Sequence, residues 1–141
     1  MALLTGRASA AYTAPEFPYA PAAGELGSTA IAHDDPAILS WANAVASVNY
    51  GSDVADEYKQ PANALGPAGT NTLDVLVLGR GGSVTMEFNP GIRDGEGWDF
   101  AVFENAFRDT FLELAYVEVS SDGEHFVRFP NYSLTAEPVG K

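Results

Sequence analysis

The sequence contains no cysteine, so disulfide bonds and thiolate metal sites are excluded. Basic side chains are scarce as well: 7 Lys and Arg stand against 19 Asp and Glu, for a net charge of −12. A nucleic-acid partner requires a basic surface that displaces counterions from phosphates, so we expect no nucleic-acid binding. An acidic surface suits divalent cations, although solubility is the commoner reason for one.

Long apolar runs are also lacking, and we therefore expect no membrane insertion. The first residues, MALLTGRASAAYTA, hold an apolar run too short for the central region of a signal peptide. Ala8-Ser9-Ala10 nevertheless has the small-x-small pattern of a cleavage site, and three prolines recur at every third position from Pro15. Residues 1–24 are expected to be an extended proline-rich arm or a leader remnant, and residues 25–141 a single domain.

What the chain does have is apolar content suited to a packed core: 46% of its 141 residues are hydrophobic, which argues against disorder. Ser83–Phe88 places Val84, Met86 and Phe88 at alternate positions, the period of a strand with one buried face. Further strands are expected over the ranges Trp98–Asn105, Leu114–Ser120, Phe126–Phe129 and Leu73–Gly79, a run that is apolar on both faces and has Asp74 as its only charge. The sequence therefore predicts a mainly β, antiparallel fold.

One helix is expected at about 35–50. Pro36 suits a first helical turn, and Ile38, Trp41, Val45 and Val48 are spaced as one apolar stripe. Gly51 would end this helix in the left-handed conformation.

An ordered set of motifs resembles a family of secreted bacterial cell-surface proteins that are similar in turn to the discoidin-like, galactose-binding-like jelly roll. The motifs are ANALGP at 62–67, GGSVTMEF at 81–88, DGEGWDFAVFEN at 94–105, FLELAYVEVSSDG at 111–123 and FVRFP at 126–130. The resemblance implies an eight-stranded antiparallel β-sandwich, an extracellular or cell-surface location and a binding role. Members of that family continue with further strands beyond the position of Lys141, so the sandwich is expected to be incomplete here.

The acidic loop around Asp94 and Asp99 predicts a structural calcium site. Calcium takes six to eight hard oxygens, and carboxylates that alternate with glycine carbonyls supply several from one loop. Glu104, or the backbone carbonyls of Ala62–Gly66 if the two loops meet, would complete the ligand set with Asp94 and Asp99. The alternative is an acidic turn in which hydrogen bonds from loop N–H groups satisfy the carboxylates.

A second candidate site is the connecting segment that holds two aromatic rings and a guanidinium. Such groups suit a carbohydrate or another small ligand, and they are Phe107, Arg108, Asp109 and Phe111. The alternative places both phenylalanines in the core. No nucleophile–base constellation stands out, and His33 and His125 offer no metal-ligand spacing.

Two functions follow from these observations. The first is a non-catalytic extracellular binding module for a carbohydrate or other small ligand, with structural calcium. The second is a surface adhesion or assembly subunit that self-associates by strand addition at an open sheet edge.

Overall fold

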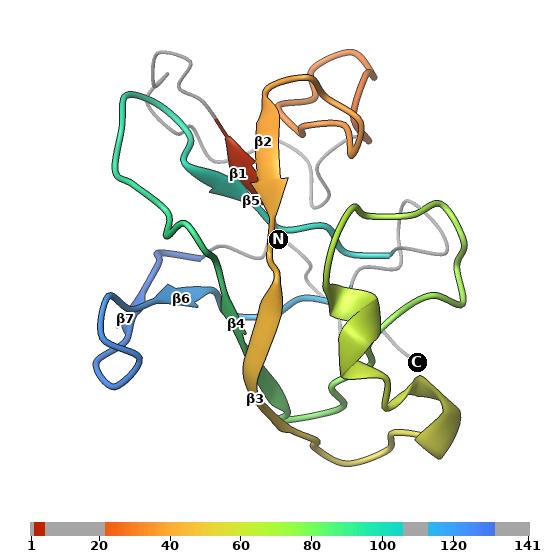
Figure 1. The fold of residues 1–141 in the computed structure, drawn as a ribbon. Coiled ribbons are helices and arrows are strands. Elements are labelled where there is room, and N and C mark those ends of the chain that lie inside the picture. The colour runs from red at the N-terminus through yellow and green to blue at the C-terminus, as the bar shows by residue number, and fades with distance from the viewer. Residues whose placement is uncertain (1, 5–21, 106–112, 132–141) are drawn as a thin grey trace. The chain divides into compact units, whose positions relative to one another are not determined.

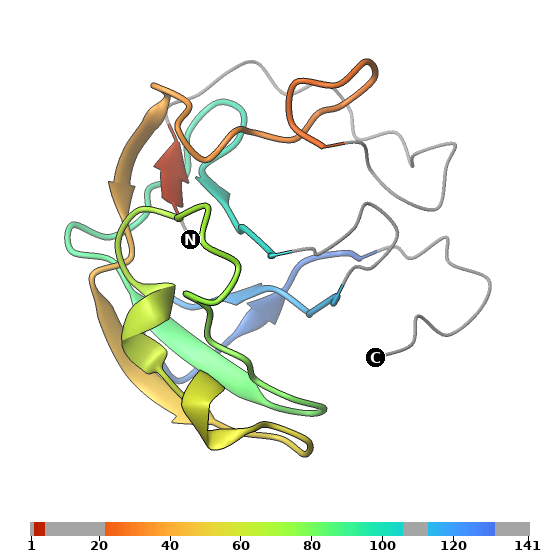
Figure 2. The same cartoon turned by 90° about the vertical axis from the view of Figure 1, so that its right-hand side faces the viewer.

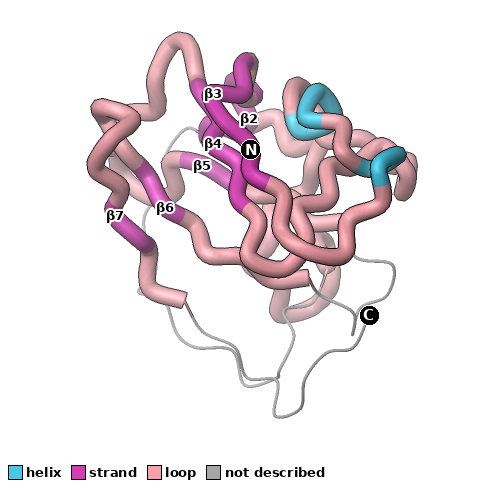
Figure 3. Tube along the Cα trace, turned by 90° about the horizontal axis from the view of Figure 1, so that it is seen from below, coloured by secondary structure: helices cyan, strands magenta, loops and turns pink. Residues whose placement is uncertain are grey.

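The computed structural model describes residues 2–4, 22–105 and 113–131 and shows a small β-rich fold in which loops connect short strands (Figures 1 and 3). The strands are β1 (Ala2–Leu4), β2 (Ile38–Trp41), β3 (Ala44–Asn49), β4 (Ser83–Glu87), β5 (Phe100–Ala101), β6 (Glu118–Val119) and β7 (Val127–Arg128). The mainly β prediction is confirmed. In the described part of the chain, no helix has the length and apolar character that a membrane crossing requires.

The chain divides into two compact units, each described here by itself. The first comprises Met1–Tyr12 and Ile31–Asn105 and contains β1 to β5. The second comprises Thr13–Ala30 and Ala106–Lys141 and contains β6 and β7.

The helix predicted at about 35–50 is wrong, because this range forms β2 and β3 instead. β3 pairs antiparallel with β4, which confirms the strand predicted over Ser83–Phe88. Val45 lies opposite Met86 and Val48 lies opposite Val84, with a register shift between Val45 and Ser47.

That register shift explains the error. Three residues of β3 are matched to two residues of β4, which leaves Ala46 as the extra residue of a β-bulge. Val45 and Val48 therefore share one face of the strand although they are three positions apart. An apolar spacing of three is also the spacing of a helical stripe, so the bulge makes this strand resemble a helix in sequence.

The other sheet of the first unit has the order β2-β1-β5, with both pairs antiparallel (Figure 1). Ala2 lies opposite Trp41 on one side and Ala101 on the other. The rings of Trp41, at the end of β2, and Phe103, just beyond β5, are in contact, with centroids 5.4 Å apart and planes inclined by 39°. Trp41 is half-buried and packs within the first unit.

Leu73–Gly79 was expected to be a strand, but the structure has no strand there. Two hydrogen bonds tie this run to the preceding segment. The Val77 N–H donates to the Tyr58 carbonyl over 3.2 Å, and the Asn63 side-chain amide donates to the Val75 carbonyl over 3.2 Å. Tyr58 and Asn63 belong to two short 3₁₀ helices, η1 (Asp56–Tyr58) and η2 (Pro61–Ala64), of which η2 lies against β3 (Figure 2). An irregular partner cannot offer a regular ladder, so the apolar run stays irregular.

Three glycines make the junction between the end of β3 and the start of β4 possible. A Cβ on Gly51 would lie 2.0 Å from the Arg80 carbonyl oxygen, and one on Gly82 would lie 2.0 Å from the Leu78 carbonyl oxygen. Gly79 combines a φ of +73° with only 2.3 Å between such a Cβ and the Ser52 carbonyl oxygen. Gly51 does not adopt the left-handed conformation expected of a helix end. Its role is close backbone approach.

In the second unit, β6 and β7 form an antiparallel hairpin, at blue positions in Figure 1. Glu118 lies opposite Arg128 and Val119 opposite Val127, and Phe129 N–H donates to the Val117 carbonyl over 3.0 Å. The strands predicted at Leu114–Ser120 and Phe126–Phe129 are therefore confirmed only in part, at Glu118–Val119 and Val127–Arg128. The strand predicted at Trp98–Asn105 is reduced to β5.

Candidate functional site

The predicted metal ligands Asp94 and Asp99 lie in one loop that leads into β5. Asp94 is exposed, and Asp99 is half-buried and accepts a hydrogen bond from the Gly95 N–H over 2.9 Å. This bond closes the loop in the way expected for a carboxylate that is satisfied by its own backbone. Glu104 is exposed beyond β5. Within the described residues, no three His, Asp or Glu side chains gather as a metal-binding group, so the three predicted ligands are not brought together.

The predicted ligand-binding residues Phe107, Arg108, Asp109 and Phe111 lie outside the described residues.

An exposed three-residue cluster on the β6–β7 hairpin was not singled out as a site from the sequence. The Arg128 guanidinium lies over the Tyr116 ring, 4.1 Å from its centroid, and its Nε donates to the Glu118 carboxylate over 2.8 Å. The strand register places Glu118 directly opposite Arg128, and Tyr116 is two positions from Glu118 on the same face. We call these three residues the Tyr116 cluster.

The Tyr116 ring presents one face to solvent. Arg128 covers the other face, yet the residue remains 64% exposed. The ring is therefore held by a cation on one side and open on the other. Tyr50 in the first unit also lies beneath a cation, Lys59, whose Nζ is 5.7 Å from the ring centroid, but Tyr50 is half-buried.

Large apolar side chains are concentrated on the same hairpin. Of the ten exposed ones among the described residues, five lie in this short stretch: Leu114, Tyr116, Phe126, Val127 and Phe129. Exposed apolar side chains gathered in one region indicate a surface that meets a partner or ligand, whereas isolated ones need no explanation.

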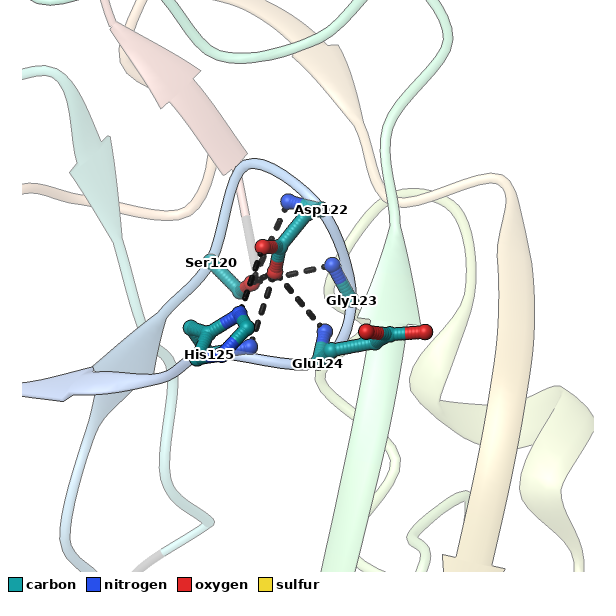
Figure 4. A network of polar contacts seen from close by, with 5 residues as sticks. All are labelled: Ser120, Asp122, Gly123, Glu124 and His125. Atoms are coloured by element: carbon teal, nitrogen blue, oxygen red, sulfur yellow. Dashed lines mark hydrogen bonds and ion pairs between the residues drawn. The ribbon is translucent and has the colours of Figure 1, made fainter.

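The turn between β6 and β7 is organised by the carboxylate of Asp122 (Figure 4). Its Oδ1 accepts hydrogen bonds from the N–H groups of Glu124 and His125, each over 2.8 Å, and from the Ser120 hydroxyl over 2.9 Å. Its Oδ2 lies 2.8 Å from Nδ1 of His125. Hydrogen bonds from the His125 backbone and ring, then from Glu124 and Ser120, hold the pKa of Asp122 well below its ordinary value of 3.8.

Serine, histidine and aspartate come together in this turn without forming a catalytic triad. In a triad the histidine lies between the other two residues and takes a proton from the serine. Here the Ser120 hydroxyl donates to Asp122, and it accepts from the N–H of Gly123 over 2.9 Å. The arrangement satisfies the backbone of a tight turn.

The signal for the Tyr116 cluster was partly visible in the sequence. Alternation predicts that Tyr116 and Glu118 point away from the core, and both are exposed. The partnership with Arg128 depends on the register of the hairpin. That register follows from the length of the Asp122 turn, which the alternation alone does not fix.

Comparison with known proteins adds no relative: no family model, curated protein or solved structure matches the chain.

Proposed function

We propose that this protein is a non-catalytic, extracellular or cell-surface binding module for a carbohydrate or other small ligand. The observation that carries the proposal is the exposed ring of Tyr116 on the β6–β7 hairpin, a residue that is 64% exposed and lies beside a carboxylate and a guanidinium. Ligand sites combine apolar and aromatic contact with a few placed polar groups. The cluster has both kinds of group on one face.

The finer architecture belongs to the same proposal. Every strand pair among the described residues is antiparallel, as in a β-sandwich of the jelly-roll type. The motif order described above, with its likeness to discoidin-like domains of secreted bacterial cell-surface proteins, supports the same architecture and location.

Structural calcium at the acidic loop is also part of the proposal. Asp94 and Asp99 belong to one loop with three glycines, whose carbonyls add hard oxygen atoms. The exposed Asp94 carboxylate can be approached by an ion from solvent. The expected role of the ion is to order this loop.

The direct test is a glycan array probed with the purified, biotinylated chain, followed by NMR mapping of any retained sugar on the ¹⁵N-labelled protein. The proposal expects retention of at least one glycan, with amide shifts concentrated in residues 114–129. An array without retained glycans would overturn the carbohydrate reading.

A second candidate function is assembly through strand addition. Within the described residues, β3 and β4 form a sheet of only two strands, as do β6 and β7, and Ala42 is the sole buried apolar residue. Sheets of two strands have marginal stability alone and two edges each at which another strand can pair.

The mass of the isolated chain in solution separates the two functions. Light scattering after size exclusion gives about 14.9 kDa for a monomer. Multiples of that mass at micromolar concentration favour assembly, and a monomer over the same range contradicts it.

A further inference from the structure

The Tyr116 cluster is built in a way that keeps its ring in one position. The Arg128 guanidinium is fixed by its Nε bond of 2.8 Å to Glu118, and it lies 4.1 Å from the centroid of Tyr116. Planar guanidinium groups stack on aromatic rings in this manner. A ring that is already held loses little side-chain freedom when a ligand stacks on it, so less binding free energy is lost to ordering.

The open face of the Tyr116 ring suits a particular kind of surface. The face of an aromatic ring carries partial negative charge. One face of a pyranose ring presents axial C–H groups, which carry partial positive charge, while its hydroxyl groups point outward around the rim. Glu118 can accept hydrogen bonds from such hydroxyls and Arg128 can donate to them. Their side chains are 38% and 52% exposed, so both are within reach of solvent.

The charge around the cluster decides between neutral and acidic sugars. Arg128 is already paired with Glu118, and Asp122 and Glu124 follow in the adjacent turn. The protein as a whole has a net charge of −12. A uronic acid would therefore meet repulsion rather than an open cation.

We propose that the solvent-facing side of the Tyr116 ring, with Glu118 and Arg128 beside it, is a stacking subsite for the apolar face of a neutral pyranose. This inference rests on the proposed function and adds the residue that stacks and the class of sugar it takes. The competing explanation is that the three residues only stabilise the hairpin by cross-strand contact.

The test uses two sugars that differ at one carbon. Methyl β-D-glucopyranoside is the neutral probe, and the methyl glycoside of β-D-glucuronic acid is its anionic counterpart. Each is titrated into the whole chain at low ionic strength while the ring ¹³C–¹H signals of the tyrosines are recorded. We expect the Tyr116 ring signals to shift with a dissociation constant on the order of 1 mM for the neutral sugar, because one monosaccharide offers few atoms.

The anionic sugar is expected to bind at least about fivefold more weakly, and the difference should shrink as salt is added. Equal or tighter binding of the glucuronide would overturn the assignment to neutral sugars. If the Tyr116 ring signals do not shift at neutral-sugar concentrations up to 100-fold above the expected dissociation constant of about 1 mM, the subsite itself is overturned.

Three variants separate stacking from hairpin stability. Tyr116→Phe keeps the ring and should bind within about twofold of the native chain, whereas Tyr116→Leu should bind about tenfold more weakly. Tyr50→Leu is the matched control, since Tyr50 also lies under a cation but is half-buried, and it should leave binding unchanged. Amide shifts of Glu118 and Arg128 report whether each variant keeps the hairpin. The titration of the native chain reads the Tyr116 ring signals directly. The subsite can therefore still be tested if the Tyr116→Leu variant does not fold.

Failure of this inference and failure of the proposed function give different results. A glycan retained on the array, whose binding moves other residues and leaves the Tyr116 ring unshifted, overturns the subsite and keeps the binding module. If the chain retains no glycan on the array and the Tyr116 ring shows no shift, both the subsite and the carbohydrate-binding function are overturned.

Discussion

At the scale of single residues, the Asp122 carboxylate organises the turn of the β6–β7 hairpin. Its Oδ1 accepts from two backbone N–H groups and one hydroxyl, and its Oδ2 faces the ring of His125 (Figure 4). These contacts favour the charged form, which is why the pKa of Asp122 lies below 3.8.

The hairpin turn is therefore expected to lose its order when the pH is lowered. The native pKa of Asp122 is depressed, so its contribution to stability is complete above the ordinary value of 3.8 and is lost as the pH falls from there through the native pKa. The ¹³C signal of the Asp122 carboxyl should titrate below pH 3.8, and the Glu124 and His125 amides should lose protection from exchange over the same range. In urea the same carboxyl should titrate at its ordinary value. A native midpoint at or above 3.8 would contradict the hydrogen-bonded turn.

Glycine positions at the β3–β4 junction allow a graded test by alanine. Gly51→Ala places a Cβ 2.0 Å from a backbone oxygen, so we expect a loss of about 2 kcal/mol or more in the free energy of unfolding. Gly81 has a φ of +75° in open space, so Gly81→Ala should cost about 1–2 kcal/mol through backbone strain alone.

Gly91→Ala serves as the control, because Gly91 has neither a close neighbour nor a positive φ and should change stability by less than about 0.5 kcal/mol. Urea denaturation of the three variants measures the order. If Gly51→Ala were as mild as Gly91→Ala, the close approach of residues 51 and 80 would be incorrect.

At the scale of elements, the bulge in β3 explains why its apolar spacing predicts a helix. Val45 and Val48 face Met86 and Val84 of β4 and are half-buried, while Ala46 is exposed at the bulge. Val48→Ala is expected to lower the free energy of unfolding by about 1–2 kcal/mol because it removes half-buried methyl groups.

The matched control is Ala46→Val, which adds methyl groups at the exposed bulge and should change stability by less than about 0.5 kcal/mol. Thermal or urea unfolding of both variants provides the comparison. A helix over this range could give the same ranking of the two variants. Far-UV circular dichroism is therefore the accompanying check, and it should show low helical content. Similar losses for both variants would contradict the register.

Elements with simple alternation could be predicted from the sequence, and those that depend on irregular partners could not. Val84 and Met86 alternate regularly, and β4 is found at Ser83–Glu87. β3 was missed because its bulge converts a period of two into a spacing of three. Leu73–Gly79 was misread because apolar content indicates burial but does not supply a regular strand for it to pair with.

The candidate site, too, could be predicted from the sequence only in its local features. Alternation predicts the outward direction of Tyr116 and Glu118, since it needs only neighbouring residues. The contact of both with Arg128 requires the pairing of β6 with β7, a long-range feature set by the hydrogen-bonded turn around Asp122. For Asp94 and Asp99, the local loop was expected. The hydrogen bond from the Gly95 N–H to Asp99 depends on the backbone conformation of this loop, which the residue types alone do not fix.

At the scale of the whole molecule, two effects on the melting temperature have to be separated: salt screening of the net charge of −12 and specific binding of calcium. Salt screens repulsion between carboxylates and should raise the melting temperature by itself. If the Asp94–Asp99 loop binds calcium, 2 mM CaCl₂ should raise the melting temperature by about 5 °C more than NaCl at equal ionic strength.

Asp94→Asn is the matched variant, because Asp94 is exposed and belongs to the proposed ligand set. The extra rise in melting temperature should disappear in this variant and in the presence of a chelator. Equal melting temperatures in CaCl₂ and NaCl would exclude a stabilising ion at this loop.

The central position of β1 has a consequence for folding during synthesis. β1 (Ala2–Leu4) is made before both of its neighbours, which are Ile38–Trp41 and Phe100–Ala101. The ribosome must therefore release most of the first unit before the three-stranded sheet can close. Until then β1 has at most one partner, and the edge that β5 will occupy stays open to other chains. Such distant pairing is slow because a long chain segment must be closed first.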